Sequence, residues 1–230
     1  MRAHGFLSLF AVAGALAVSN TSLAENAPET PIKPVSTEYH GVTIQDPYQW
    51  LENDDDAQVK AWSDAQNQRA RKYLDHLPDR TAIETQLKEW YAKTSPSYSS
   101  LVSRPGMLFA MKFQPPKQQQ LLVTLTSADD LKSEKVVLDP NVLDAKGTTA
   151  IDWFVPSLDG KYVAVSLSKG GSEDGTLHFY ETATGKALPD TIAHVQYPTA
   201  GGSGAWNADG TGVYYTRFPR KGERPDADLN

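Results

Sequence analysis

The sequence predicts a mainly β fold that follows an N-terminal helical segment, and three observations support this fold class. Between about residues 55 and 93, apolar residues recur at three- and four-residue steps, the period of a helix with one buried face. Beyond residue 97, short runs rich in β-branched and aromatic residues alternate with turn residues. A motif in this second region also repeats after fifty residues. Because no helical pattern separates the β runs, we expect antiparallel strands.

Two helices are predicted in the N-terminal segment, which we assign to residues 39–96. The first covers Asp55 to His76, and Pro78 ends its apolar pattern. The second covers about Arg80 to Lys93 and presents one apolar face. The acidic run Asp54–Asp56 precedes the first helix, where negative charge favours a helix N-terminus, so we do not interpret it as a calcium loop.

The first 38 residues predict a secretory signal and a short leader. Phe6–Val18 is an uncharged, mostly apolar run, and small residues follow at the positions that a signal peptidase reads. We therefore expect residues 1–24 to be a signal peptide that is cut between Ala24 and Glu25. The alternative is an uncleaved membrane anchor, but the run is shorter than the ~20 residues that span a bilayer. The Pro-rich stretch 25–38 is predicted to be an extended or disordered leader.

Export would place the mature chain in a periplasm or outside the cell, with no membrane segment after cleavage of the signal. No segment after the signal is long and apolar enough to predict a spanning helix. The chain has no cysteine, which excludes disulfides, Cys-ligated zinc and a cysteine nucleophile. Its formal net charge is -6 and it has no Lys/Arg run, so nucleic acid is not an expected partner.

The β region, residues 97–230, contains seven candidate strands separated by turn residues. The candidates are Leu108–Phe113, Leu121–Thr126, Lys135–Leu138, Trp153–Val155, Tyr162–Ser168, Leu177–Tyr180 and Val213–Thr216. Runs of this length bounded by Asp-Gly, Thr-Gly and Pro-Gly pairs are typical of hairpins. The spacing of the runs predicts a succession of small antiparallel sheets.

A repeat in this region predicts the architecture. Ser157–Ser166 matches Asn207–Thr216, each copy has a tryptophan shortly before it (Trp153 and Trp206), and a poorer copy begins at Arg104. Four-stranded units that repeat every 40 to 50 residues indicate a β-propeller. The alternative is two unrelated Asp-Gly hairpins. About two to three units fit into the chain, whereas a closed propeller needs at least four, so we expect a partial propeller.

No catalytic, cofactor-binding or metal-binding residue can be assigned from local motifs. Gly201–Ala205 and Gly170–Asp174 approach the G-x-S-x-G nucleophile motif, but both lack its last glycine and both lie among predicted strands. A glycine-rich loop is the better interpretation of each. The histidines beyond the signal have no metal-ligand spacing; they are His40, His76, His178 and His194.

Several motifs, in order, resemble the prolyl oligopeptidase (prolyl endopeptidase) family of serine peptidases. The first is Asp46-Pro47-Tyr48-Gln49-Trp50-Leu51-Glu52, close to the D-P-Y-R-W-L-E of the family, with Gln49 in place of the usual arginine. Others are Leu138–Asn141, Ser157–Ala164, Ser168–Glu173 and Ala205–Gly210. The resemblance covers about residues 36–219. We assign Asp46, Pro47, Tyr48, Trp50, Leu51 and Glu52 as a structural family motif.

The resemblance implies a two-domain enzyme. A seven-bladed propeller covers an α/β-hydrolase domain with a Ser-Asp-His triad, and the helical segment packs on that hydrolase domain. The implied activity is cleavage of short proline-containing peptides after proline, with no cofactor. The triad would lie beyond Asn230 in a C-terminal hydrolase domain that this sequence lacks, so the chain alone is expected to be inactive and to need that domain as a partner. The alternative is a non-catalytic exported propeller-like module that binds peptides or proteins.

Overall fold

The computed structural model describes residues 26–195, 202–220 and 222–225. The chain divides between Glu84 and Thr85 into two compact units, and this division falls within the second predicted helix. The predicted signal peptide, with its cleavage site at Ala24 and Glu25, lies outside the described residues.

The first unit contains a β-hairpin that the sequence analysis did not predict. Strand β1 (Val35–Tyr39) pairs antiparallel with β2 (Val42–Asp46), and the turn between them has positive φ at His40 and Gly41. The end of the predicted leader is therefore a strand, and residues 26–34 before it have no regular secondary structure. Both strands are almost entirely exposed, so they lack the alternating burial pattern that sequence reasoning recognises.

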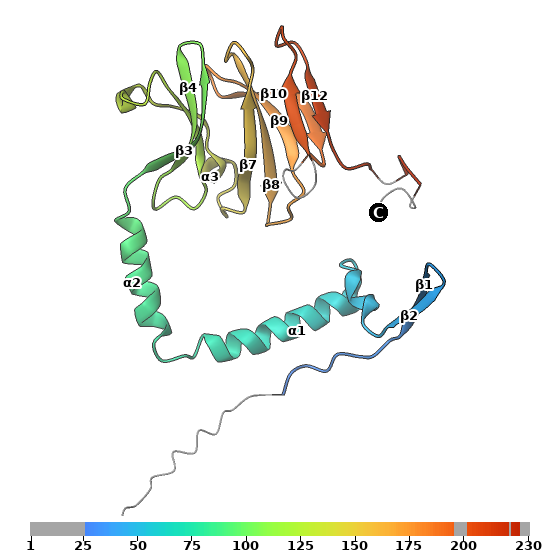
Figure 1. Cartoon of the computed structure of the whole chain (residues 1–230). Coiled ribbons are helices and arrows are strands. Elements are labelled where there is room, and N and C mark those ends of the chain that lie inside the picture. The colour runs from blue at the N-terminus through green and yellow to red at the C-terminus, as the bar shows by residue number, and fades with distance from the viewer. Residues whose placement is uncertain (1–25, 196–201, 221, 226–230) are drawn as a thin grey trace, which may run out of the picture. The chain divides into compact units, whose positions relative to one another are not determined.

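The two predicted helices are confirmed, with small shifts at their ends. After the 3-10 turn η1 (Gln49–Glu52), α1 spans Ala57–Leu74 and α2 spans Arg80–Ala92 (Figure 1). Asp56 is the N-cap of α1, because its carboxylate accepts a hydrogen bond of 2.7 Å from the backbone N–H of Gln58. The acidic run therefore acts at the helix start, as its position predicted.

The second unit is built from antiparallel sheets in sequence order, which Figure 1 shows side by side. The first sheet has the order β3-β4-β5-β6 and the second β10-β9-β8-β7, while β11 and β12 form a two-stranded sheet. Their bounds are β3 Ser97–Arg104, β4 Met107–Phe113, β5 Leu121–Leu125, β6 Lys135–Leu138, β7 Thr149–Pro156, β8 Tyr162–Lys169, β9 Thr176–Glu181, β10 Lys186–Ala193, β11 Ser203–Trp206 and β12 Val213–Thr216. Two four-stranded units and the start of a third confirm the partial propeller.

All seven predicted strands are present, and three further strands complete the sheets. These are β3, β10 and β11, which pair with β4, β9 and β12. Strand β3 is rich in serine and β10 contains Pro189, neither of which favours a strand by intrinsic propensity. Both lie at the edges of their sheets, where proline is tolerated and one side of the backbone needs no ladder partner. Two short helical turns, η2 (Leu131–Ser133) and α3 (Pro140–Leu143), lie on either side of β6.

The hydrophobic core lies between neighbouring sheets. Phe109 and Leu122 of the first sheet pack with Val163 and Val165 of β8. On the other face of the second sheet, Ala164, Leu177 and Phe179 pack with Trp206 and Val213 of the third sheet, within one further buried cluster. Strand β8 is therefore buried on both faces, which explains why its sequence is a nearly continuous apolar run.

The fifty-residue repeat corresponds to two turns with matching hydrogen bonds. The backbone N–H of Tyr162 donates to the Ser157 hydroxyl over 3.0 Å, and that of Gly212 donates over 3.0 Å to the side-chain oxygen of Asn207. Gly160 and Gly210 both have positive φ at the corresponding position. The two tryptophans are not equivalent: Trp206 directly precedes its turn in β11, whereas Trp153 lies deeper in β7. The repeated turns thus start successive sheets.

We expect Trp206 to hold the third sheet against the second. Its indole N–H donates a hydrogen bond of 2.9 Å to the carbonyl of Val155 in β7, and its ring stacks on Tyr162. The substitution Trp206→Phe keeps a ring but removes the donor, and we predict a loss of about 1 kcal/mol in the free energy of unfolding, measured by urea denaturation. The control Tyr214→Phe alters an exposed residue of β12 and should stay within about 0.5 kcal/mol. Equal midpoints for both variants would contradict this role.

Candidate functional site

The family-like motif at Asp46–Glu52 forms a turn that leads from the hairpin into η1. The carboxylate of Asp46 accepts a hydrogen bond of 2.7 Å from the backbone N–H of Tyr48, and the N–H of Leu51 donates to the Tyr48 carbonyl. The ring of Trp50 meets Trp62 of α1 edge to face, with 6.5 Å between the centroids. The motif residues thus shape the backbone and an aromatic contact, and they bring no nucleophile or base together.

The two glycine-rich segments occupy strands and turns, not a nucleophile elbow. Gly170 and Gly171 have positive φ in the turn between β8 and β9. Ser203 starts β11, and its hydroxyl lies 2.9 Å from the hydroxyl of Thr216 in β12. Gly201 lies outside the described residues. A nucleophilic serine needs a strand-to-helix turn and an adjacent base, and Ser203 has neither in this arrangement.

One histidine is paired with a carboxylate. The Nδ1 of His194 lies 2.7 Å from Asp174 Oδ1, a contact that a base and its orienting acid make in hydrolases. The nearby Ser172 hydroxyl instead accepts from the backbone N–H of Asp174. Within residues 26–195, 202–220 and 222–225, no serine hydroxyl bonds to a histidine ring. The pair therefore joins the loop after β10 to the β8–β9 turn.

Metal and membrane sites find no support in the part of the chain that the structure describes. Its His, Asp and Glu residues form no group of three or more that could hold a metal ion. None of its helices has the length and apolar character required to cross a membrane.

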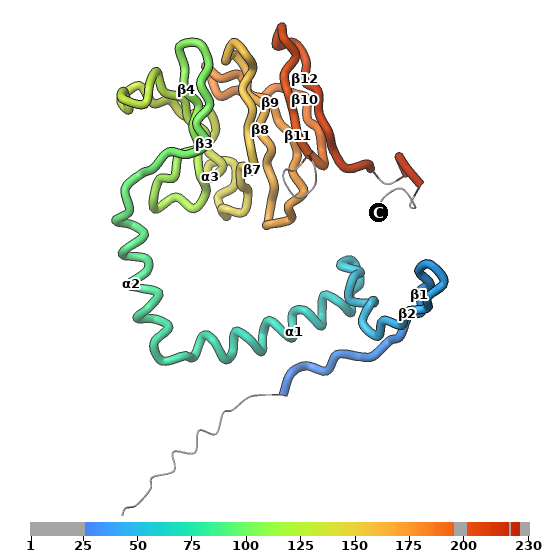
Figure 2. Tube along the Cα trace, in the orientation of Figure 1, coloured from blue at the N-terminus to red at the C-terminus, as the bar shows by residue number. Residues whose placement is uncertain are grey.

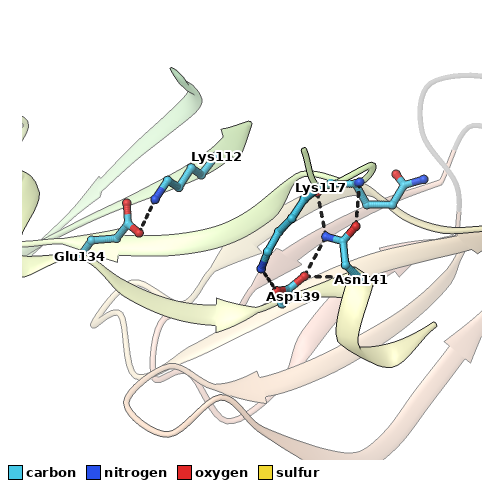
Figure 3. A network of polar contacts seen from close by, with 6 residues as sticks. Lys112, Lys117, Glu134, Asp139 and Asn141 are labelled. Carbon is cyan, nitrogen blue, oxygen red and sulfur yellow. Dashed lines mark hydrogen bonds and ion pairs between the residues drawn. The ribbon is translucent and has the colours of Figure 1, made fainter. Parts of the chain in front are cut away.

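A polar network ties the loop after β4 to the segment after β6 (Figure 3). Lys117 pairs with the carboxylate of Asp139, which also accepts bonds of 2.8 and 3.0 Å from the side chain and backbone of Asn141. Asn141 exchanges two further bonds with the backbone of Gln119, at 2.9 and 3.0 Å. Burial alone would raise the pKa of Asp139, but the bonds from Lys117 and Asn141 outweigh it and lower the pKa. The network fixes the loop geometry with an ionised carboxylate.

A second ion pair crosses the first sheet. Lys112 of β4 lies 2.6 Å from a carboxylate oxygen of Glu134, and the hydroxyl of Tyr98 in β3 donates to the other oxygen over 2.5 Å (Figure 3 shows the ion pair). The hydrogen bond to Glu134, with burial and the nearby negative charge, raises the pKa of Tyr98 to about 12. Tyr98 therefore stays a neutral donor at physiological pH.

Asp152 is a half-buried carboxylate in the second sheet, and none of the residues that the structure describes supplies it with a cation. It lies at an irregularity of the β7–β8 ladder, between the pairs of Ile151 and Trp153, and accepts bonds of 2.9 and 2.5 Å from the hydroxyls of Ser166 and Ser168. Burial raises the pKa of Asp152 above its ordinary value, although the two serine hydroxyls act in the opposite direction. The two hydrogen bonds join Asp152 to the neighbouring strand at the bulge.

Turns of three successive sheets meet around a shallow cavity of about 300 Å³. Its lining residues are Pro105, Leu158, Asp159, Ala208, Asp209 and Gly210. Arg104 connects two of these turns, because its guanidinium donates to the carbonyls of Ser157 and Pro156 over 2.8 and 3.0 Å. The weak repeat copy that begins at Arg104 thus lies beside the turns it resembles. The cavity is lined by two carboxylates and apolar surface, and its lining residues include no serine or histidine.

The described side chains hold the loops that connect the propeller strands. Comparison with known proteins shows the family to which the chain belongs. A family model described as the N-terminal β-propeller domain of prolyl oligopeptidase matches residues 28–230. The chain belongs to the prolyl oligopeptidase family. The resemblance seen in the motifs is confirmed, and so is the partial propeller of this family.

Curated relatives support the same assignment. Prolyl oligopeptidase ophP of Omphalotus olearius is 30% identical over 214 residues, which cover 83% of this chain and 28% of that protein. The prolyl endopeptidase of Elizabethkingia meningoseptica is 30% identical over 198 residues, which cover 85% of this chain and 26% of that protein. The chain thus spans less than a third of the length of these relatives.

Solved structures share the fold. A structure from a study of two prolyl endopeptidases has a TM-score of 0.71 at 30% identity, and the match covers 86% of this chain and 28% of that one. Prolyl oligopeptidase B from Galerina marginata, bound to a 35mer substrate, has a TM-score of 0.65 at 23% identity, over 84% of this chain and 30% of that one. The second likeness supports the fold alone.

Sequence reasoning missed most of the polar groups that position the loops in this family member. Lys117 gave no signal of its own in the sequence, and Asp139 and Asn141 were recognised only as part of the motif Leu138–Asn141. Asp152 gave no signal, since it takes its partners from the neighbouring strand. A carboxylate directly before Pro140 at a helix start is the one local cue that identifies a capping role.

Two carboxylates with opposite pKa shifts give a paired prediction. Asp139→Asn should lower the free energy of unfolding at pH 7 by about 1 kcal/mol, because asparagine caps a helix as well but loses the charged bond to Lys117. Asp152→Asn should leave it unchanged or raise it, because a half-buried charge is removed.

The pH dependence of urea unfolding checks the assignment. The lowered pKa of Asp139 makes its contribution present above the ordinary value of 3.8 and lost as pH falls through the lowered pKa. The raised pKa of Asp152 has the opposite effect on stability. The contribution of Asp152 to the free energy of unfolding therefore declines as pH rises from 3.8 through the raised pKa. Each asparagine variant should remove the pH dependence of the unfolding free energy that its own carboxylate contributes. Destabilisation by Asp152→Asn at pH 7 would show that the charged bulge is required.

Proposed function

We propose that this chain is the N-terminal part of an exported prolyl oligopeptidase-type serine endopeptidase that hydrolyses short peptides after proline. The family match over residues 28–230 supports this, as do relatives named prolyl oligopeptidase and prolyl endopeptidase. In this proposal the Ser-Asp-His triad belongs to a hydrolase domain encoded beyond Asn230, and the reaction needs no metal or organic cofactor.

Among the described residues, no nucleophile is paired with a base. This observation supports the proposal that the hydrolase domain, and not this chain, supplies the catalytic residues. His194 is held by Asp174 without a serine, and Ser203 is part of a strand. A serine hydroxyl is a weak nucleophile unless a general base takes its proton. The blades would accordingly line part of the path by which peptides reach the hydrolase domain. The chemical reaction would take place in the hydrolase domain.

The exposed apolar faces of the helices support a further part of the proposal. Ile83, Leu87 and Trp90 of α2 expose 57%, 54% and 62% of their surface, and they share one helix face at three- and four-residue steps. Leaving large apolar side chains exposed forfeits the hydrophobic contribution that their burial would make. We propose that the hydrolase domain covers this face in the whole enzyme, so that the chain alone is marginally stable.

Peptidase activity is expected to require the product of the whole gene. A peptide with one internal proline should remain intact with residues 25–230 alone and should be cleaved on the carboxyl side of that proline by the whole-gene product, with mass spectrometry as the readout. The matched control is the same peptide with alanine in place of proline. Cleavage by residues 25–230 would contradict the proposed division of labour. Binding without cleavage by the whole-gene product would favour a non-catalytic peptide-binding module.

Export is tested separately from catalysis. We expect the mature protein, isolated from the periplasm or the medium, to begin at Glu25, because Ala24 ends the predicted signal. N-terminal sequencing of the protein from each cell fraction measures this. A protein that retains Met1–Ala24 and remains with the membrane fraction would identify an uncleaved anchor instead.

A further inference from the structure

A proline-rich segment of the first unit lies along α1 without forming secondary structure of its own. Residues 26–34 are extended, and Figure 2 shows them running alongside α1 before β1 begins. Pro28, Pro31 and Pro34 are spaced three residues apart, and a polyproline II helix has three residues per turn. Pro28, Thr30 and Pro31 are half-buried, whereas most of their neighbours in the segment are exposed. One side of the segment therefore faces the helix.

Side-chain donors of η1 and α1 bind this side of the segment. The indole N–H of Trp50 donates to the carbonyl of Pro31 over 3.0 Å, and the side-chain amide of Gln66 donates to the carbonyl of Pro28 over 3.2 Å. The indole N–H of Trp62 donates to the hydroxyl of Thr30 over 3.0 Å. The proline carbonyls have no partner strand, because the extended segment does not join a sheet. These side chains therefore donate the hydrogen bonds that a neighbouring strand would donate in a sheet.

A basic residue follows the second proline and has contacts of its own. The Nζ of Lys33 lies 4.4 Å from the centroid of the Trp50 ring and bonds to the side-chain oxygen of Gln58. Its backbone N–H donates to the carbonyl of Pro47 over 2.9 Å. A cation over an indole face is an attractive contact of its own, and it adds a preference for positive charge at this position. The segment thus presents a Pro-x-x-Pro-x-Lys pattern.

This combination has the chemistry by which modules recognise extended proline-rich peptides. Such modules pair aromatic surfaces with donors for carbonyls at the polyproline II spacing. We propose that the face formed by Trp50, Gln58, Trp62 and Gln66, here called the indole face, is a binding site for Pro-x-x-Pro peptides followed by a basic residue. In this chain its own residues 28–33 occupy the site as a tethered ligand. The site is separate from the proposed peptidase reaction and does not depend on it.

A tethered ligand competes with any free peptide, because a short linker gives it a millimolar effective concentration. The test therefore uses the full chain with the tether weakened by Thr30→Val and Lys33→Gln, which remove contacts but leave the indole face intact. The probe is the synthetic peptide Asn26–Pro34 with an amino-terminal fluorophore, and binding is measured by fluorescence anisotropy. The control peptide carries Pro28→Ala and Pro31→Ala.

The expected result is saturable binding to the weakened chain, at least about tenfold tighter than to the unmodified chain. Adding Trp62→Phe or Gln66→Ala to the weakened chain should each reduce the affinity about five- to tenfold, as should the control peptide. Equal affinity for the probe and control peptides, or no saturable binding to the weakened chain, would overturn the proposal. Far-UV circular dichroism must be the same for all variants.

Hydrogen exchange of the indole N–H groups provides an independent readout in the unmodified chain. The N–H of Trp62 should exchange slowly, and Thr30→Val should accelerate the exchange of Trp62 more than that of Trp50, because it removes only the acceptor of Trp62. Exchange of both indoles at the rate of an unfolded chain would show that the tether does not occupy the face, and would overturn the proposal.

Discussion

The structure depends on the burial of apolar side chains between successive sheets. A lone antiparallel sheet has two faces, and β8 lies at the centre of a sheet whose faces are covered by different neighbours: Phe109 on one side and Trp206 on the other. Neither cluster can form within one sheet, so each blade requires the next. The hydrogen bonds that cross between sheets follow from the same constraint, since Arg104 and Trp206 both satisfy carbonyls at the end of β7.

The placement of the polar groups follows from that core. The ionised pair of Lys117 and Asp139 organises a loop, and the bonds from Lys117 and Asn141 outweigh the cost of burying the carboxylate. No described residue supplies a cation to Asp152, and burial raises the pKa of this carboxylate. These groups fix backbone geometry, and the described residues hold no assembled nucleophile. In the first unit, two indole N–H groups and one side-chain amide bind a proline-rich segment that could not pair as a strand in a sheet. In both units, polar side chains hold segments of the chain in place, and the chain belongs to a peptidase family.

The helices, strands and turns that could be predicted from the sequence are those that their own local residue pattern specifies. Both helices, the seven most apolar strands and the repeated Asp-Gly turns have local signals in the sequence. The ordered motifs that begin at Asp46 resemble the family whose model matches the chain. Strands β3, β10 and β11 escaped prediction because pairing with their neighbours stabilises them, not their propensity. The site chemistry was less accessible: Asp152 and Trp62 have partners 14 to 32 residues away, and no local pattern specifies such pairs.

In the proposed function, residues 97–230 form blades of a prolyl oligopeptidase-type peptidase, and the described residues of this chain supply no activated serine. A fluorophosphonate reacts with a serine only where a general base activates it, and tests this claim directly. We expect no labelled serine in the chain, under conditions that label a control serine peptidase completely. Stoichiometric labelling of one serine, such as Ser172 beside the His194–Asp174 pair, would contradict the account and place a catalytic centre within the blades.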